Sequence, residues 1–239
     1  MAGSALARVK GLYASGARGA GRVLTKVGVL GEEPPPRSKR LEHWAFSLTR
    51  AHDSLAIAEL DVPWWTYDAI AAVEAWVTDH DGPVRVFEWG SGASTLWLAK
   101  RVDAVTTVEH HRGFAEHIAP NLAEHPNITS LIIEPETSTT PEVPSAKEGH
   151  KGLDFAAYVR AIDDAGGPFD LIVIDGRARE ACLRAAIPHL ADDGLIVFDN
   201  TRRRRYREAI AAAPVSVQRT TGLTPTLPYP DETSLLRTR

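Results

Sequence analysis

The chain has 239 residues and a formal net charge of −4, with 44% hydrophobic and 24% charged residues. This length and balance suit one folded domain with an appended segment, argue against a fibrous or wholly disordered chain, and carry no overall nucleic-acid-binding signature. The single cysteine, Cys182, excludes an internal disulfide and a cysteine-cluster metal site. No apolar run is long enough to span a membrane. We therefore expect a cytoplasmic protein.

Residues 1–40 have the composition of an extension. Residues 1–30 carry five basic residues and no acidic residue and are interrupted by glycines, and apolar side chains at helical spacing are compatible with a basic amphipathic helix. Four interpretations stay open for this segment: a partly disordered tail, a helix packed on the domain, a helix in contact with a second copy in a homo-oligomer, and a helix in peripheral contact with a membrane surface. Three consecutive prolines within residues 32–37 predict an extended linker. The folded domain is accordingly expected over residues 41–239.

Residues 41–60 are predicted to be helical in part, and a helix is expected over residues 67–77. Trp64 and Trp65 stand just before that helix. We expect these tryptophans to cover the edge of the sheet or the core, and the alternative is that they contact a substrate.

Residues 84–100 predict a strand, a tight glycine turn and a helix. Gly90 and Gly92 let the backbone turn sharply and approach a ligand closely, while the new helix presents free N–H groups to an anion. A dinucleotide fingerprint requires a third small residue where this chain has Thr95. Glu88 would repel a pyrophosphate and suits a cationic amino group, while the helix N-terminus suits a carboxylate. Together, Glu88 and the helix N-terminus favour the zwitterionic end of an amino acid.

A second strand is expected over residues 104–108, and Glu109 follows it at the spacing of a residue that accepts hydrogen bonds from ribose hydroxyls. An amino-acid end together with a ribose describes S-adenosylmethionine. His110 is expected near the adenosine.

The rest of the chain continues the alternation of strands and helices. A third strand is expected at residues 127–133. Residues 135–152 form a long insert, either a functional lid or a disordered segment, with His150 and Lys151 at its end. A helix at residues 153–162 precedes a buried strand at 171–174 that ends in Asp175. A helix at residues 179–190 leads to a strand at 195–198 that ends in Asp199 and Asn200. After a helix that carries the arginine run 202–205, two last strands are expected at residues 214–220 and 232–238.

These motifs resemble those of the class I S-adenosylmethionine-dependent methyltransferases. The resemblance rests on residues 88–92, on Val108 with Glu109, and on residues 169–176 and 193–200, in the right order and spacing. It implies a Rossmann-like, doubly wound α/β fold with a mostly parallel seven-stranded sheet and an antiparallel C-terminal edge hairpin. The cofactor-binding residues that it implies are Glu88, Trp89, Gly90, Ser91, Gly92, Ser94, Thr95, Glu109, His110 and Asp175.

Two routes to methyl transfer stay open. In one, Asp175, Asp199 and Asn200 hold Mg²⁺ through oxygen atoms, as in the cation-dependent catechol-type O-methyltransferases that this arrangement resembles. In the other, no metal takes part and Asp175, Asp199 or His150 is the catalytic base. Arg177, Arg202 and Tyr206 are the expected substrate contacts, because arginine forks bind carboxylates and phosphates.

The expected reaction is O-methylation of a small molecule, a sugar or a specialised metabolite. Three alternatives remain. One is a nucleic-acid methyltransferase, motivated by the arginine run and disfavoured by the acidic net charge. Another is a non-catalytic S-adenosylmethionine-binding subunit. The third is an NAD-dependent oxidoreductase.

Overall fold

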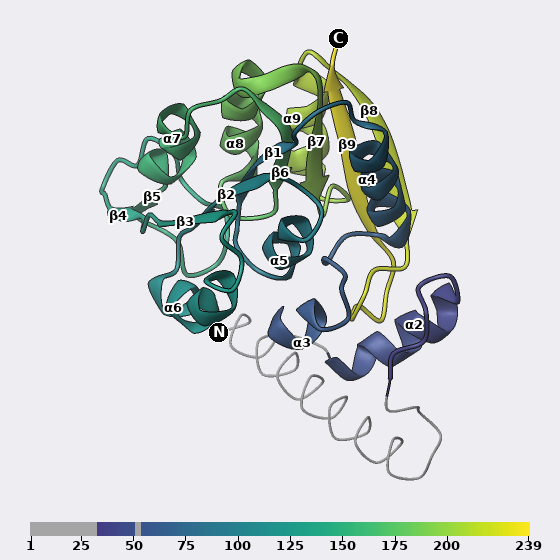
Figure 1. Ribbon diagram of the computed structural model, residues 1–239. Helices are drawn as coiled ribbons and strands as arrows, with labels where there is room; N and C mark the ends of the chain where they lie inside the picture. The colour runs from purple at the N-terminus through teal and green to yellow at the C-terminus, as the bar shows by residue number, and fades with distance from the viewer. Residues whose placement is uncertain (1–32, 51–53) are drawn as a thin grey trace.

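The computed structural model describes residues 33–50 and 54–239 (Figure 1). The basic segment within residues 1–30, and most of the predicted extension, lie outside the described residues. Two short helices, α2 (Arg40–Ser47) and α3 (Ser54–Ala58), precede the main sheet in the chain. The 3-10 turn η1 (Leu48–Arg50) follows α2. No helix within the described part of the chain has the length and apolar character needed to cross a membrane.

A seven-stranded sheet forms the centre of the molecule, in the order β3-β2-β1-β6-β7-β9-β8. Its parallel part consists of β1 (Arg85–Trp89), β2 (Ala104–Glu109), β3 (Ile128–Ile132), β6 (Phe169–Ile174) and β7 (Leu190–Asp199). The strands β8 (Val215–Gly222) and β9 (Asp231–Thr238) pair antiparallel at one edge. This confirms the predicted Rossmann-like sheet and its C-terminal hairpin.

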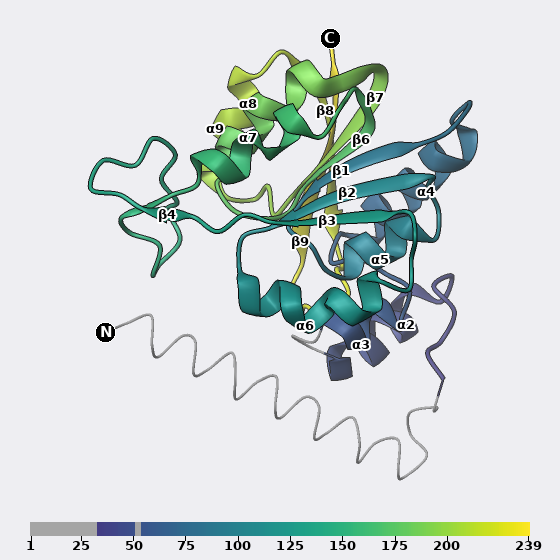
Figure 2. The same cartoon turned by 60° about the vertical axis from the view of Figure 1, so that its left-hand side comes forward.

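Helices cover both faces of the sheet, as the doubly wound prediction requires. One face carries α4 (Tyr67–Asp79), α5 (Ala93–Ala99) and α6 (Arg112–Leu122), and the other carries α7 (Ala156–Asp164), α8 (Arg179–Ala186) and α9 (Arg204–Ala212) (Figure 2). The α8 helix ends in a 3-10 turn, η2 (Ile187–His189), which completes the segment expected as one helix over residues 179–190.

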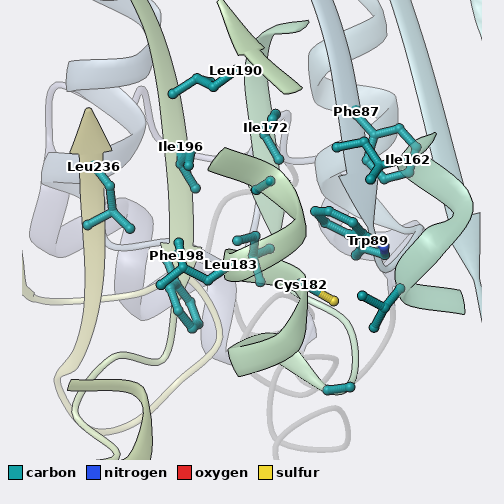
Figure 3. Packing of buried hydrophobic residues seen from close by; sticks show 14 of the residues in the cluster. Phe87, Trp89, Ile162, Ile172, Cys182, Leu183, Leu190, Ile196, Phe198 and Leu236 are labelled. Atoms are coloured by element: carbon teal, nitrogen blue, oxygen red, sulfur yellow. The ribbon is translucent and has the colours of Figure 1, made fainter. Parts of the chain in front are cut away.

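The pleat of the buried strands divides the core into two layers. Along β6, Leu171 and Val173 pack on the α4 and α5 face, whereas Ile172 and Ile174 pack on the α7 and α8 face. Figure 3 shows the second layer, where Ile172 and neighbouring strand residues meet Leu183 of α8. Because both faces of β6 are covered, residues 171–174 are all apolar, as the sequence pattern indicated.

The insert after β3 contains a second, two-stranded sheet that the sequence did not predict. It pairs β4 (Glu136–Thr137) with β5 (Leu153–Asp154). The Asp154 carboxylate accepts hydrogen bonds from the backbone N–H groups of Val143, at 3.0 Å, and of Ala156, at 2.9 Å. Since Leu153 and Asp154 pair in this sheet, α7 begins at Ala156, three residues later than expected.

The order of the strands fixes where a ligand can bind. β1 lies between β2 and β6, and the chain winds from β1 outward to β2 and β3, then crosses back to β6 on the other side. Crevices outside the carboxyl ends of strands form at such a switch point. The ends of β1 and β6 therefore define the expected binding crevice.

Candidate functional site: a crevice at the carboxyl ends of β1, β2, β6 and β7

A glycine elbow joins β1 to α5. Gly90 has a φ of +103°, and the Cβ of any other residue there would lie 2.8 Å from the Cα of Gly176. The Gly90 N–H donates to the Val108 carbonyl at 2.9 Å, and the Asp175 N–H donates to the Trp89 carbonyl at 3.0 Å. Glycine at position 90 thus lets the ends of β1, β2 and β6 approach closely enough to form one floor.

Glu88 lies beneath this elbow rather than in the open crevice. The Oε1 atom accepts from the Ser94 hydroxyl at 2.5 Å, and Oε2 accepts from the hydroxyls of Thr95 and, at 3.0 Å, Thr107. Burial raises the pKa of the Glu88 carboxyl to about 7, against the opposing effect of these three hydroxyl groups. The structure therefore differs from the expectation of a direct contact with the ligand's amino group, because α5 covers this carboxyl.

A cavity of about 560 Å³ opens above the elbow. This volume lies within the range of roughly 300–1,000 Å³ that is usual for ligand pockets. The predicted site residues that line the cavity are Gly90, Ser91, Gly92, Ser94, Glu109, His110, Asp175, Arg177, Asp199 and Asn200.

Five predicted contacts do not line this cavity: Glu88, Trp89, Thr95, Arg202 and Tyr206. Trp89 faces the α7 side of the sheet, where its indole N–H donates to the Tyr158 carbonyl at 3.0 Å. Arg202 is exposed and donates to the Pro230 carbonyl at 2.8 Å. Tyr206 is buried against Phe198, with 5.2 Å between the ring centroids.

Glu109 stands at the tip of β2 and faces the crevice. Its Oε1 accepts from the His111 N–H at 2.8 Å and lies 2.7 Å from Nδ1 of His110. Oε2 has no hydrogen-bond partner within residues 33–50 and 54–239. A carboxylate oxygen left free at the edge of a pocket can accept a hydrogen bond from a ligand hydroxyl.

Arg179 connects the ends of β6 and β7, and the sequence analysis did not single it out. Its guanidinium is 5% exposed and lies 2.6 Å from Oδ1 of Asp175 and 3.9 Å from Oδ2 of Asp199. It also donates to the backbone carbonyls of Gly176, at 3.1 Å, and Asp199, at 2.6 Å. Its position four residues after Asp175, at the first residue of the following helix, is the signal that could have identified it.

Burial controls the ionisation of the two aspartates. Burial raises the pKa of Asp175, and the positive charges of Arg179 and Arg177 oppose that shift. Burial and then the charge of Asp175 raise the pKa of Asp199 well above its usual range. Burial therefore favours the protonated form of both carboxyl groups.

The side chains of Asp175, Asp199 and Asn200 do not form a set of ligands that suits Mg²⁺. The Asn200 amide N–H group donates to Oδ2 of Asp199 at 2.6 Å and to Oδ2 of Asp231 at 2.9 Å, so it presents donors where a metal needs oxygen. The other oxygen of Asp199 accepts from the Thr233 hydroxyl at 2.8 Å. Across the described ranges, no three His, Cys, Asp or Glu side chains are grouped to hold a metal. The guanidinium of Arg179 provides the positive charge that the predicted metal would have provided.

The walls of the cavity include residues whose role the sequence left open. Trp64 lines the cavity and its indole N–H donates to Thr226 Oγ1 at 2.8 Å, whereas Trp65 is fully buried and packs edge-on against Trp97. The two neighbouring tryptophans thus have different roles, one at the pocket and one in the core. His150 of the insert also lines the cavity, and Lys151 does not.

Comparisons with known proteins agree with this geometry. A family model described as a methyltransferase domain matches residues 87–201. Rv0187 from MTB, solved with its cofactor bound, aligns with a TM-score of 0.57 and 20% identity over 88% of this chain and 99% of that one. A protein from Staphylococcus aureus assigned as a caffeoyl-CoA O-methyltransferase aligns with a TM-score of 0.52 and 14% identity over 80% of this chain and 94% of that one.

No curated protein matches the sequence of this chain significantly. The two structural likenesses establish the fold, and the family model covers the elbow, Glu109, Asp175 and Asp199. The chain therefore contains a methyltransferase domain, matched over residues 87–201, and has the Rossmann-like fold that the aligned structures share.

Proposed function

We propose that the protein methylates an oxygen atom of a small molecule, and that the crevice above the elbow binds both S-adenosylmethionine and the acceptor. The observation that carries this proposal is the composition of a single cavity. The elbow, the free oxygen of Glu109 and two proton-accepting groups, Asp175 and His150, all line it.

The elbow and Glu109 are the groups that would hold the cofactor. Among the described residues, the atom that a Cβ at Gly92 would meet first is Ser54 Oγ, at 4.0 Å, so the described residues leave this backbone open to a ligand. Glu109 Oε2 offers an acceptor for ribose hydroxyls, and His110 stands beside it. When bound, S-adenosylmethionine supplies an electrophilic methyl group for in-line transfer.

The chain's own contribution is to position the acceptor and to take its proton. His150 suits the second task, because burial, together with the charges of Lys147 and Arg177, lowers its pKa and keeps the imidazole neutral at pH 7. Nδ1 of His150 lies 3.2 Å from the Glu148 carbonyl, which leaves Nε2 with its lone pair. Asp175 keeps Oδ2 outside its bond with Arg179 and can orient the acceptor hydroxyl.

Asp199 is less suited to act as the base. Both of its carboxyl oxygens already accept hydrogen bonds, and its side chain is 3% exposed. We therefore assign it a positioning role at the floor of the crevice and propose a reaction that needs no metal ion.

Cofactor binding is tested by calorimetry with S-adenosylhomocysteine and, side by side, NAD. We expect S-adenosylhomocysteine to bind and NAD not to bind. The Glu109→Gln substitution keeps the size of the side chain and removes its charge, so we expect S-adenosylhomocysteine to bind about tenfold more weakly or worse. Glu116→Gln changes an exposed glutamate on α6 and serves as the matched control. Equal affinities in the two variants would mean that the ribose does not bind at Glu109.

The acceptor class is tested with a methyl-labelled donor. The protein is incubated in parallel with a small-molecule extract and with total RNA, and the label is then located by mass spectrometry. Label on a small-molecule oxygen is the expected result. Label on RNA would favour a nucleic-acid methyltransferase, and cofactor binding without any transfer would favour a non-catalytic subunit.

A further inference from the structure

A second cavity, of about 920 Å³, lies beside the cofactor crevice. Its walls come from the insert at residues 145–148, from the turn at 176–180 and from the first residues of α9. Gly176 and Arg177 line both cavities, so the second begins where the first ends. The second cavity also has a basic wall, formed by Lys147, Arg177, Arg203, Arg204 and Arg205.

The arginines of this wall differ in whether they have an acidic partner. Arg204 lies 2.6 Å from Glu208, and Arg205 lies 3.2 Å from Glu180. Within the described ranges, neither Arg177 nor Arg203 forms an ion pair with a carboxylate. The positive charges of Arg177 and Arg203 are therefore available to pair with an anionic ligand.

Arg177 is the more unusual of the two because it is only partly exposed. Its Nη1 donates to the Gly176 carbonyl at 3.3 Å, and its Nε is buried without a hydrogen-bond partner. Burial and the neighbouring charge of Arg179 lower the pKa of the Arg177 guanidinium. A buried donor without an acceptor is unfavourable, and a charged donor more so, which makes this group a site prepared for an anion.

We propose that the methyl acceptor carries one anionic group, a phosphate or a carboxylate, and that Arg177, supported by Arg203, binds it where the two cavities meet. This inference rests on the proposed function for its reaction and adds the class of substrate. Arg177 follows Asp175 by two residues at the end of β6, so an acceptor anchored there extends its uncharged part into the cofactor crevice.

The charges around the second cavity favour a single anionic group over a nucleic-acid backbone. Glu148, Glu180 and Glu208 line the same cavity as the arginines. Glu208 and Glu180 already pair with Arg204 and Arg205, so these two arginines are less available to the further phosphates of an extended polyanion.

The test uses phenyl phosphate as the probe and benzyl alcohol as its uncharged counterpart, measured by ligand-observed NMR with S-adenosylhomocysteine present and absent. We expect the wild-type protein to bind phenyl phosphate more tightly than benzyl alcohol. Arg177→Met should weaken phenyl phosphate binding about tenfold or more, and Arg177→Lys should weaken it less. Arg219→Met removes an exposed arginine of β8 outside both cavities and should bind like the wild type.

Equal binding of phenyl phosphate by the wild type and Arg177→Met would overturn the proposal, as would equal affinity for the two probes. Tighter, Arg177-dependent binding of a single-stranded RNA oligonucleotide would overturn it in favour of a polyanion. Melting curves of each variant separate loss of binding from loss of folding. If the wild type binds phenyl phosphate but not S-adenosylhomocysteine, the proposed function fails while the anion site stands.

Discussion

Glu88 shows how one residue type can have a different role from the one its motif suggests. In a strand, alternate side chains point to opposite faces, so Val86 and Glu88 face α5 while Phe87 and Trp89 face α7. Glu88 therefore meets the hydroxyls of α5 and becomes fully buried. Its carboxyl supports the elbow from below, and Glu109 is the carboxylate that lines the cavity.

The raised pKa of Glu88 makes a prediction about stability. The folded protein holds this proton with a pKa of about 7, against 4.5 as the reference value, so folding favours the protonated form. The stability that this group contributes is present below pH 4.5 and is lost as the pH rises through 7, by about 3 kcal/mol in total.

We therefore expect Glu88→Gln to reduce the fall in unfolding free energy between pH 5 and pH 8. Urea unfolding of both proteins at the two pH values measures this, with Glu116→Gln as the exposed control. If Glu88→Gln and the wild type lose the same stability over this range, Glu88 is ionised in the folded protein across the whole interval.

At the scale of elements, the elbow depends on the closeness of two backbones. Gly90 and Gly82 both have positive φ, +103° and +94°, but a Cβ at Gly82 would meet no atom within 4 Å. Alanine substitutions at the two glycines therefore separate the free-energy cost of the backbone conformation from the cost of the close approach between β1 and β6.

Gly82→Ala should lose about 1 kcal/mol of unfolding free energy from the conformation alone. Gly90→Ala should lose about 1–3 kcal/mol more, because the added methyl group forces the Gly176 backbone away. It should also abolish S-adenosylhomocysteine binding, which Gly82→Ala should retain. Chemical denaturation and calorimetry measure the two effects, and similar losses in both variants would show that the elbow tolerates separation.

At the scale of the whole molecule, the sheet topology brings acids from distant parts of the sequence to one edge, and Arg179 balances their charge. Asp175 and Asp199 lie at the ends of the paired strands β6 and β7, and Asp231 begins β9. Without a cation among them, these carboxyl groups would repel one another.

Arg179→Met should therefore destabilise the protein by about 3 kcal/mol or more at pH 8. The loss should be smaller at pH 5, because removing the guanidinium raises the pKa of both carboxyl groups and they become protonated as the pH falls. Urea unfolding at the two pH values measures this, with Arg219→Met as the control. An equal loss at both pH values would assign Arg179 a packing role only.

The same charge balance predicts how the protein responds to metals. Because Arg179 already compensates the acids, we expect neither Mg²⁺ nor a chelator to shift the unfolding midpoint of the wild type. A midpoint that rises with Mg²⁺ concentration would reveal a metal site at the edge of the sheet and contradict the proposed metal-free reaction.

The sequence by itself determined the seven strands of the main sheet and the helices between them, in order, but not the small β4–β5 sheet. Local signals sufficed for this, because the glycine turn, the buried strand at residues 171–174 and the C-terminal hairpin are each encoded by neighbouring residues. The doubly wound, mostly parallel sheet then followed from the family resemblance, and the carboxyl ends of the parallel strands indicated the crevice. Glu109 and Asp175 were found in this way.

Only the tertiary structure decided what each polar side chain contacts. Glu88 is covered by α5, Tyr206 packs into the core, and Arg179 fills the position expected for a metal, and each of these outcomes depends on side chains that meet across different elements. The sequence fixes which residues occupy a strand or a helix, because backbone preferences act over a few residues. It does not reveal which charged side chains will pair, because the distances between side chains on different elements are set only when the sheet and its helices pack together.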